Sequence, residues 1–202
     1  MWIAVDIDNT IANTNLWLVR AFNITLKKYP APEVPAGFFD SNESIKLFQD
    51  VEPFPDAAIT LQILEGLGFK IAYISSRPKS VLLPTLHWLK QHEFPKQHDS
   101  SKHHLFCGLT TNEKKVFLTQ KLHAVACFED DPVLAKSLLG EVPVVWLKDW
   151  PYNHKIPAHK NKRGEISRVT RFDSWWDVYN IVLTTNYGLA DAVYGGYLRG
   201  EF

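Results

Sequence analysis

The feature that most constrains this chain is a short apolar run near its N-terminus that stops at two acidic residues. Residues 2–5 read Trp-Ile-Ala-Val, and Asp6 and Asp8 follow with one residue between them. An apolar run of this length predicts a buried strand. Two carboxylates just past a buried strand lie close together, which is costly unless a cation or a shared proton relieves the repulsion. The opening residues therefore predict a charged site at a strand end. An acidic turn that merely caps the strand would give the same sequence pattern.

Strands and helices alternate along the rest of the chain. Further apolar strands are predicted at 69–74, 124–128 and 142–147. The intervening segments have helical periodicity, which predicts parallel β-α-β units in a three-layer α/β sandwich with a Rossmann-like parallel sheet. In such sheets ligands bind at the carboxyl ends of the strands. Because polar or acidic residues follow three of the predicted strands, at Asp6, Ser75 and Glu129, we expect these side chains to share one site.

The composition limits the partners that the chain attracts. Lysine and arginine together number 22, as do aspartate and glutamate, so no net charge draws in nucleic acid or an anionic membrane. Two cysteines are too few for a disulfide framework, and a reducing, cytoplasmic location is expected. We expect no signal peptide and no membrane span, since no apolar stretch approaches the roughly 20 residues that cross a bilayer. The sequence leaves the oligomeric state open.

The segment from Asp6 to Thr10 resembles the first motif of the haloacid dehalogenase superfamily, in which Asp-x-Asp-x-Thr follows a strand. The resemblance implies that Asp6 attacks phosphorus and becomes an aspartyl-phosphate, while Asp8 protonates the leaving group and then activates water. The spacing suits this chemistry, because a carboxylate is a weak nucleophile that must approach an anionic phosphate. A magnesium ion that holds both groups would remove the repulsion and fix an in-line geometry.

The resemblance continues at the serines after the second predicted strand. Ser75 matches the family's second motif, which implies that its hydroxyl holds a phosphoryl oxygen, and Ser76 is the competing candidate. Arg77 would add positive charge there. Ser76, Arg77, Asn9 and Thr10 are accordingly the residues that we expect to bind the substrate. A simple turn before the following proline would explain the two serines equally well.

The third motif is a lysine that neutralises Asp6 and the transferring phosphoryl group. Lys114 and Lys115 both match it. Lys115 lies three and seven residues before Leu118 and Leu122, so a regular helix would place the three side chains on one inward face. This spacing favours Lys115 over Lys114.

The fourth motif is an acidic pair after a strand, which completes a magnesium site in the family. The sequence offers Glu129, Asp130 and Asp131, where the usual pair is Asp-Asp. A proline follows Asp131, and proline favours the first helical position after a capping aspartate. We therefore expect Asp131 to be a helix cap and assign Glu129 and Asp130 to Mg²⁺, together with Asp6 and the backbone carbonyl of Asp8. Which of the two acids binds the ion directly is left open.

The segment between the first two motifs is too long for a turn. Residues 11–54 separate them, and proline-interrupted helical periodicity predicts a small helical cap. The expected division is a haloacid dehalogenase-like core at 1–13 and 52–185, a cap at 14–51 and a C-terminal tail at 186–202.

Four segments resemble the 5′(3′)-deoxyribonucleotidase branch of the superfamily, namely 53–57, 73–78, 129–132 and 150–153. In that branch the cap and the loop after the last strands shape a nucleotide pocket. The resemblance implies a magnesium-dependent phosphohydrolase whose partner is a small phosphorylated substrate, with nucleoside monophosphates as the favoured class.

Two alternative functions share this core. A polynucleotide 3′-phosphatase is suggested by basic residues after the last predicted strand, Lys155, His159, Lys160, Lys162 and Arg163. A solvated loop accounts for these residues more simply, so nucleic acid is the less favoured partner. A non-catalytic nucleotide-binding protein is the other alternative, and the intact Asp6 and Asp8 argue against it.

Overall fold

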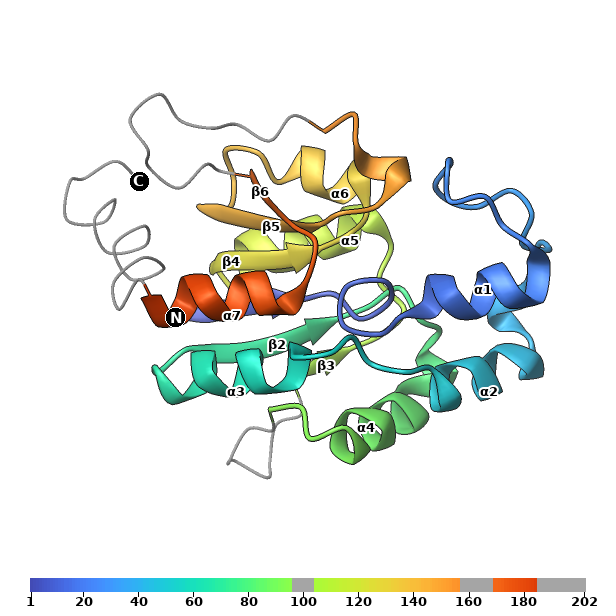
Figure 1. Cartoon of the computed structure of the whole chain (residues 1–202), viewed down its shortest axis with the longest axis horizontal. Coiled ribbons are helices and arrows are strands. Elements are labelled where there is room, and N and C mark those ends of the chain that lie inside the picture. The colour runs from blue at the N-terminus through green and yellow to red at the C-terminus, as the bar shows by residue number, and fades with distance from the viewer. Residues whose placement is uncertain (96–103, 157–168, 185–202) are drawn as a thin grey trace.

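A parallel sheet forms the centre of the molecule. The computed structural model describes residues 1–95, 104–156 and 169–184 (Figure 1). The six strands are β1 (Trp2–Val5), β2 (Lys70–Ile74), β3 (Leu105–Phe106), β4 (Ala124–Glu129), β5 (Val144–Lys148) and β6 (Val169–Phe172). All neighbours pair in parallel, in the order β3-β2-β1-β4-β5-β6. The predicted α/β class with a Rossmann-like parallel sheet is confirmed, and the sequence missed the short strands β3 and β6.

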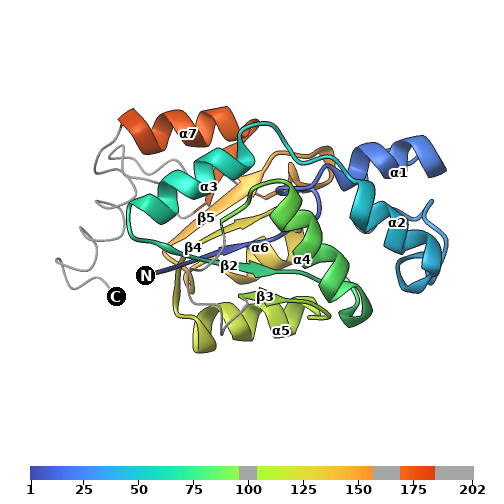
Figure 2. The same cartoon turned by 90° about the horizontal axis from the view of Figure 1, so that it is seen from below.

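Helices cover both faces of this sheet. They are α1 (Thr14–Phe22), α2 (Asn42–Asp50), α3 (Ala57–Gly66), α4 (Leu82–Gln91), α5 (Thr111–Val116), α6 (Pro132–Ser137) and α7 (Trp175–Thr184). Helices α3 and α7 pack side by side over one face, while α5 and α6 pack together against the other (Figure 2). None of the described helices combines the length and the apolar content that crossing a bilayer requires.

Strand β1 shows how the sequence produces a hydrophobic core on each face. Successive side chains of a strand point to opposite faces. Ile3 and Val5 belong to the cluster under α3, α4 and α7, whereas Ala4 belongs to the cluster under α5 and α6. All three are at most 1% exposed, so both faces of β1 are covered, as a central parallel strand requires. The next residue, Asp6, is thereby placed at the middle of the sheet's carboxyl edge.

The segment predicted as a cap lies beyond the carboxyl ends of the strands, where α1 and α2 project from the sheet (Figure 1). Its apolar residues Leu18 and Phe38 belong to the same hydrophobic cluster as Ile7 and Trp88 of the core, and α2 packs on α4. The segment at 14–51 therefore shares the core of the sheet. The division into core and cap stays a prediction.

Two regions singled out in the sequence lie outside the described residues. One is the tail at 186–202, and the other is the part of the basic loop at 157–168. Of the basic residues assigned to that loop, Lys155 alone falls within the described part of the chain.

One hydrogen bond that joins α4 to the end of α2 yields a testable prediction. Trp88 is 1% exposed, and its Nε1 donates to the Val51 carbonyl at 2.6 Å. Trp88→Phe leaves that buried carbonyl without its donor, and we expect the free energy of unfolding to fall by about 1–3 kcal/mol in urea denaturation.

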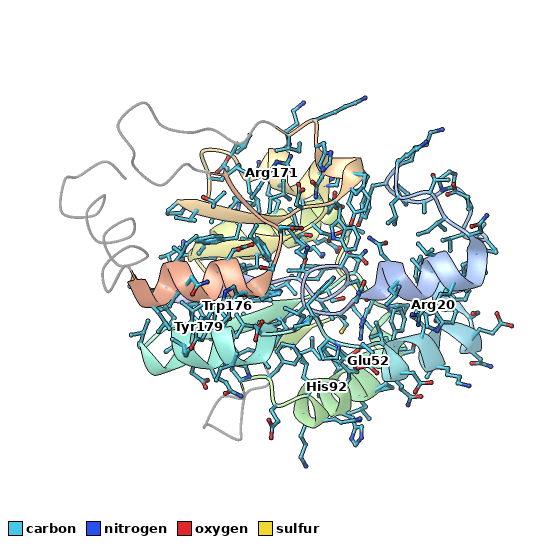
Figure 3. The ribbon with its side chains drawn as sticks, in the orientation of Figure 1. Arg20, Glu52, His92, Arg171, Trp176 and Tyr179 are labelled. Atoms are coloured by element: carbon cyan, nitrogen blue, oxygen red, sulfur yellow. The ribbon has the colours of Figure 1, made fainter. Side chains whose placement is uncertain are left out.

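The matched control is Trp176→Phe. Trp176 lies on α7 with 53% of its surface exposed (Figure 3), so its replacement should change the free energy of unfolding by about 0.5 kcal/mol or less. Equal effects of the two substitutions would contradict the link between α2 and α4.

Candidate active site

Three carboxylates meet where β1 and β4 end side by side. Asp6 follows β1, and its backbone N–H donates to the Phe128 carbonyl of β4 at 2.9 Å. Glu129 is the last residue of β4 and Asp130 follows it. All three are at most 5% exposed, and one carboxylate oxygen from each lies within 4.8 Å of the others. The structure therefore brings these three predicted site residues together at the sheet edge, and their roles stay a prediction.

Lys114, and not Lys115, supplies the cation at this point. Lys114 Nζ lies 2.5 Å from Asp6 Oδ1 and 3.8 Å from Glu129 Oε2, and its side chain is 6% exposed. Lys115 is 35% exposed and pairs with Glu141 at 3.5 Å on the outside of the molecule. The prediction that Lys115 faces the site is therefore wrong.

The helix itself explains the error. Helix α5 ends at Val116, and the chain continues as a π-helical turn at Phe117–Lys121. A wider turn changes the angular spacing, so residues three and seven positions after Lys115 no longer share its face. Lys114 lies four residues before the buried Leu118, and this spacing was the available signal for the correct lysine.

The three carboxylates carry more charge than Lys114 can balance. Burial and the neighbouring Glu129 raise the pKa of Asp6 well above its usual range. Burial, Asp6 and Glu129 do the same to the pKa of Asp130. Burial alone would lower the pKa of Lys114, but Asp6 and Glu129 outweigh it and keep the amine protonated. A cluster with three acids and one ammonium has a deficit of positive charge, and its oxygen-only donor set suits a hard cation such as Mg²⁺.

Glu129 and Asp131 both accept hydrogen bonds from backbone N–H groups, but Glu129 lies in the cluster whereas Asp131 caps a helix. Glu129 Oε1 accepts from the N–H groups of Asp130 and Asp131, both at 3.0 Å, which fixes the carboxylate beside Lys114. Asp131 Oδ1 accepts from the N–H of Val133 at 2.7 Å and caps α6, with a proline at its first position. The prediction of Asp131 as a helix cap is confirmed.

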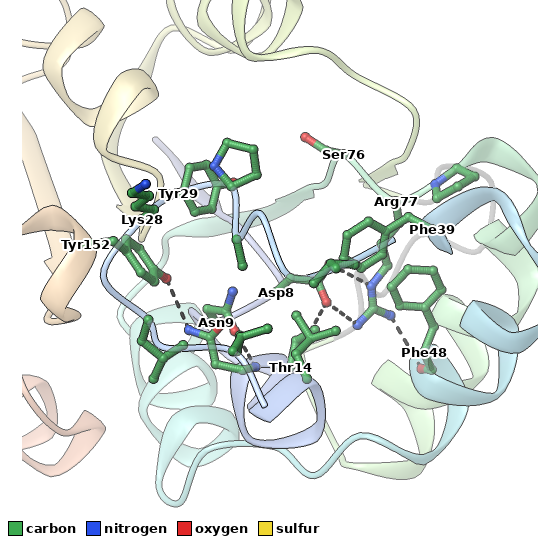
Figure 4. A pocket seen from close by; sticks show the side chains of 18 residues that line it. Asp8, Asn9, Thr14, Lys28, Tyr29, Phe39, Phe48, Ser76, Arg77 and Tyr152 are labelled. Carbon is green, nitrogen blue, oxygen red and sulfur yellow. Dashed lines mark hydrogen bonds and ion pairs between the residues drawn. The ribbon is translucent and has the colours of Figure 1, made fainter. Parts of the chain in front are cut away.

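Asp8 is held by a buried arginine. Arg77 Nε and Nη2 donate to the two oxygens of Asp8, each at 2.9 Å, and Thr14 Oγ1 donates to Asp8 Oδ1 at 2.6 Å (Figure 4). The guanidinium stacks on Phe48, 4.5 Å from the ring centre. Although burial opposes the effect, the charge of Arg77 lowers the pKa of Asp8. Arg77, predicted to contact substrate, is thus bound to Asp8 in this structure.

The two serines after β2 occupy different environments. Ser75 is completely buried, and its Oγ accepts from the Arg77 backbone N–H at 3.0 Å. Ser76 lines the neighbouring cavity, and its Oγ donates to the Leu109 carbonyl at 2.9 Å. Both lie at the expected strand end, and the choice between them as the phosphoryl-binding residue stays a prediction.

A cavity of about 260 Å³ lies between these strand ends and the cap segment (Figure 4). The cap segment contributes mainly apolar side chains, which are Leu18, Ile24, Leu26, Val34, Phe39 and Phe48. The strand-end loops contribute polar ones, among them Asp8, Asn9, Ser76, Arg77 and Tyr152. Asn9 therefore lies where a substrate-binding residue is expected.

Thr10 lies elsewhere. Its side chain is fully buried and does not line the cavity, and its carbonyl accepts a hydrogen bond from Trp175 Nε1 at 2.8 Å. The predicted contact between Thr10 and the substrate disagrees with this placement, because the side chain is buried away from the cavity and the Thr10 carbonyl contacts Trp175 of α7.

The segment after β5 adds contacts that the sequence did not assign. The Tyr152 hydroxyl donates to Asp130 Oδ2, Asn153 Nδ2 donates to the Asp130 carbonyl at 3.0 Å, and Trp150 Nε1 donates to the Asn9 carbonyl at 2.9 Å. The segment follows β5, which pairs with β4 in the sheet, and this position was the signal that the segment lies close to Asp130.

The environment of the two lysines predicts opposite outcomes for their removal. In the metal-free protein, Lys114→Met leaves three buried carboxylates without a cation, and we expect the free energy of unfolding to fall by about 3–5 kcal/mol. Lys115→Met removes an exposed pair and should change it by about 0.5 kcal/mol or less. Urea denaturation measures both, and a larger loss for Lys115→Met would contradict the assignment.

The excess negative charge predicts a pH-dependent stabilisation by Mg²⁺. Because the folded state raises the pKa of Asp6 and Asp130, the metal-free protein loses stability as pH rises above the ordinary carboxyl range. Mg²⁺ at about 100 times its Kd should stabilise by about 2.7 kcal/mol, or roughly 5–10 °C in Tm, at pH 7.5. The shift should shrink at pH 5, where protons compete with the ion. An undiminished shift in Asp130→Asn would contradict this site.

Comparisons with known proteins agree with the fold. No family model matches the chain. A protein of Oceanobacillus iheyensis named "Putative nucleotidase" is 38% identical over 138 residues, which make up 68% of this chain and 65% of that protein. A protein of Bacillus cereus with the same printed name is 31% identical over 135 residues, or 67% of this chain and 63% of that protein. The chain thus spans slightly less than two thirds of the length of these curated relatives.

A solved structure supports the fold. The structure described as a HAD family hydrolase from Deinococcus radiodurans, with bound phosphate and sodium, has a TM-score of 0.52 at 15% identity and covers 93% of this chain and 96% of that one. At this identity the likeness concerns the fold alone. The parallel sheet and these matches show that the chain has the fold of haloacid dehalogenase-like hydrolases and is similar in sequence to proteins named as putative nucleotidases.

Proposed function

We propose that this chain is a magnesium-dependent phosphohydrolase that forms an aspartyl-phosphate on Asp6 and acts on nucleoside monophosphates. The observation that carries the proposal is the cluster of Asp6, Glu129, Asp130 and Lys114, which is buried at the carboxyl edge of the sheet. The cavity-lining Asp8 is two positions after Asp6. The residues proposed as nucleophile, neutralising cation and acid–base group thus lie together where an α/β sheet places its ligands.

Asp6 acts as the nucleophile in this proposal. Lys114 holds its Oδ1, which orients the carboxylate and offsets its repulsion of an arriving phosphate. An oxygen of Asp6 attacks phosphorus while the bond from phosphorus to the leaving oxygen breaks. The products of this step are the aspartyl-phosphate and, after proton transfer, the alcohol.

Asp8 moves the protons. It donates one to the leaving oxygen, then takes one from the water that hydrolyses the aspartyl-phosphate, which releases phosphate and restores Asp6. The ion pair with Arg77 favours the ionised form of Asp8 that the second step needs. For the first step Asp8 must take up a proton, and the negative charge of an arriving phosphate favours this protonation.

The metal-binding residues fit the same scheme. Asp6, Glu129 and Asp130 would hold Mg²⁺, with the backbone carbonyl of Asp8 as a further oxygen donor. A bound magnesium ion would supply positive charge for the transferring phosphoryl group.

The cavity supports a nucleoside as the leaving group. Aromatic and aliphatic side chains of the cap segment, such as Phe39 and Phe48, face the polar strand ends across about 260 Å³. A base can stack on such apolar walls, while Ser76 and Asn9 offer hydrogen bonds near the phosphate. The nucleotidase name of two sequence relatives supports the same class.

A polynucleotide 3′-phosphatase is the alternative, and the described residues give no observation that favours it. The basic residues that suggested it lie outside the described part of the chain, apart from Lys155. Better turnover of a 3′-phosphorylated oligonucleotide than of mononucleotides, with strong salt dependence, would replace the proposal by this alternative.

The activity itself is tested with a panel of nucleoside monophosphates and a phosphate-release assay, with and without Mg²⁺. We expect Asp6→Asn to lower the rate by roughly a thousandfold or more, because the nucleophile is lost. Asp50→Asn, an exposed change on α2, should keep the wild-type rate. Full phosphate release by Asp6→Asn, or by the wild-type protein without Mg²⁺, would refute the proposed mechanism.

A further inference from the structure

Tyr152 lies where the carboxylate cluster and the cavity meet. It belongs to a short 3₁₀ turn at Pro151–Asn153, directly after β5, and it lines the cavity. Its ring stacks on Trp150, with ring centres 6.1 Å apart, and faces Tyr29 of the cap segment at 5.2 Å. Tyr152 takes no part in the chemistry proposed above.

The Tyr152 hydroxyl connects two parts of the molecule. It hydrogen-bonds Asp130 Oδ2. Asn15 Nδ2 lies 3.3 Å from the hydroxyl oxygen, and a dashed line from Tyr152 marks this contact in Figure 4. An ionised carboxylate only accepts hydrogen bonds and an amide –NH₂ only donates them. The hydroxyl proton therefore points to Asp130, and its oxygen accepts from Asn15. The resulting chain of polar groups runs from the cap helix α1 through Tyr152 to the metal-site carboxylate.

The backbone around Tyr152 is anchored on the same residues. Asn153 Nδ2 donates to the Asp130 carbonyl at 3.0 Å and to the Lys148 carbonyl at 2.8 Å, and Asn153 is fully buried. Trp150 Nε1 donates to the Asn9 carbonyl at 2.9 Å. With both neighbours fixed, the Tyr152 ring has little freedom to turn its hydroxyl away from Asp130.

A carboxylate that binds a metal needs such an outer contact. Among the described residues, the Tyr152 hydroxyl is the donor that contacts the Asp130 carboxylate. It leaves the second oxygen of Asp130 for the ion. Partners of this kind orient metal-binding carboxylates, and their loss typically lowers metal affinity by about 10- to 100-fold.

We propose that Tyr152 is a positioning residue that holds Asp130 for the cation and, through Asn15, makes cation affinity depend on the cap segment. The inference rests on the metal site of the proposed function, but it does not need the chain to be a phosphatase. Because Asn15 and Tyr152 both line the cavity, linkage requires that a ligand which steadies them also strengthens cation binding.

The test measures Mg²⁺ binding directly, without turnover. Metal-free wild-type protein and the Tyr152→Phe variant are titrated with MgCl₂ in an isothermal titration calorimeter. Phenylalanine keeps the ring contacts and removes the hydroxyl alone, so we expect the Kd for Mg²⁺ to rise about tenfold. Tyr179→Phe is the matched control, since Tyr179 stacks on Trp176 on the outer side of α7 (Figure 3), and it should leave the Kd unchanged.

Asn15→Ala tests the link to the cap from its other end. It should raise the Kd for Mg²⁺ about twofold or more in the presence of Tyr152, and much less in the Tyr152→Phe background. Independent effects of the two substitutions would overturn the link. A Tyr152→Phe variant with a lower Tm but an unchanged Kd would show a purely structural role and overturn the positioning of Asp130.

The outcome for the wild-type protein separates the two proposals. Wild-type protein that binds no Mg²⁺ would overturn this inference and the metal site together. Wild-type protein that binds Mg²⁺ but releases no phosphate from any substrate would remove the proposed function, and the change in Kd for Tyr152→Phe would still decide the present inference.

Discussion

The contact between Asp6 and Lys114 is the interaction on which the rest of the site depends. Burying a carboxylate without a partner is expensive, and here three are buried within a few ångströms of each other. Lys114 relieves the repulsion at Asp6 and, more weakly, at Glu129, but it leaves a net negative charge. The sheet accepts this arrangement because β1 and β4 are neighbours that end at the same edge. Because the cluster is left with a net negative charge, it should attract a cation, and the bound cation could in turn hold an anion.

The second acid of the opening motif belongs to a different network. The Asp8 carboxylate is held by Arg77 and Thr14, and the guanidinium in turn stacks on Phe48 of α2. Displacement of α2 would therefore disturb the residue that holds Asp8. The cap segment is thus joined to Asp8 through Arg77 and to Asp130 through Tyr152. Because its apolar residues also share the core of the sheet, the segment is part of the site's framework.

The positions of the acids could be predicted from the sequence, whereas for the lysine the sequence offered two competing spacings, and the wrong one was preferred. Any parallel sheet brings strand ends to one edge, so the acidic residues after β1 and β4 had to meet if the strands were neighbours. Choosing Lys115 assumed a regular helix, and the π-helical turn after Val116 invalidated that assumption. Strand β6 was missed because its four residues, Val-Thr-Arg-Phe, show no alternation of apolar and polar side chains. The contact of Tyr152 with Asp130 joins residues 22 positions apart, and no local pattern encodes such a pairing.

The cavity offers a substrate two kinds of contact, charged groups at the strand ends and apolar side chains in the cap segment. Asp8 and Arg77 come from the strand-end loops, and most of its apolar residues come from the cap segment. The charged end would bind whatever phosphate group is common to many substrates, so it discriminates little between them. Apolar burial contributes in proportion to the area covered, so walls such as Phe39 and Leu26 would set which leaving group fits. It follows that changes in this segment should alter substrate choice with little effect on the carboxylates. The exceptions are Thr14, which holds Asp8 directly, and Asn15 and Phe48, which contact the residues that hold Asp130 and Asp8.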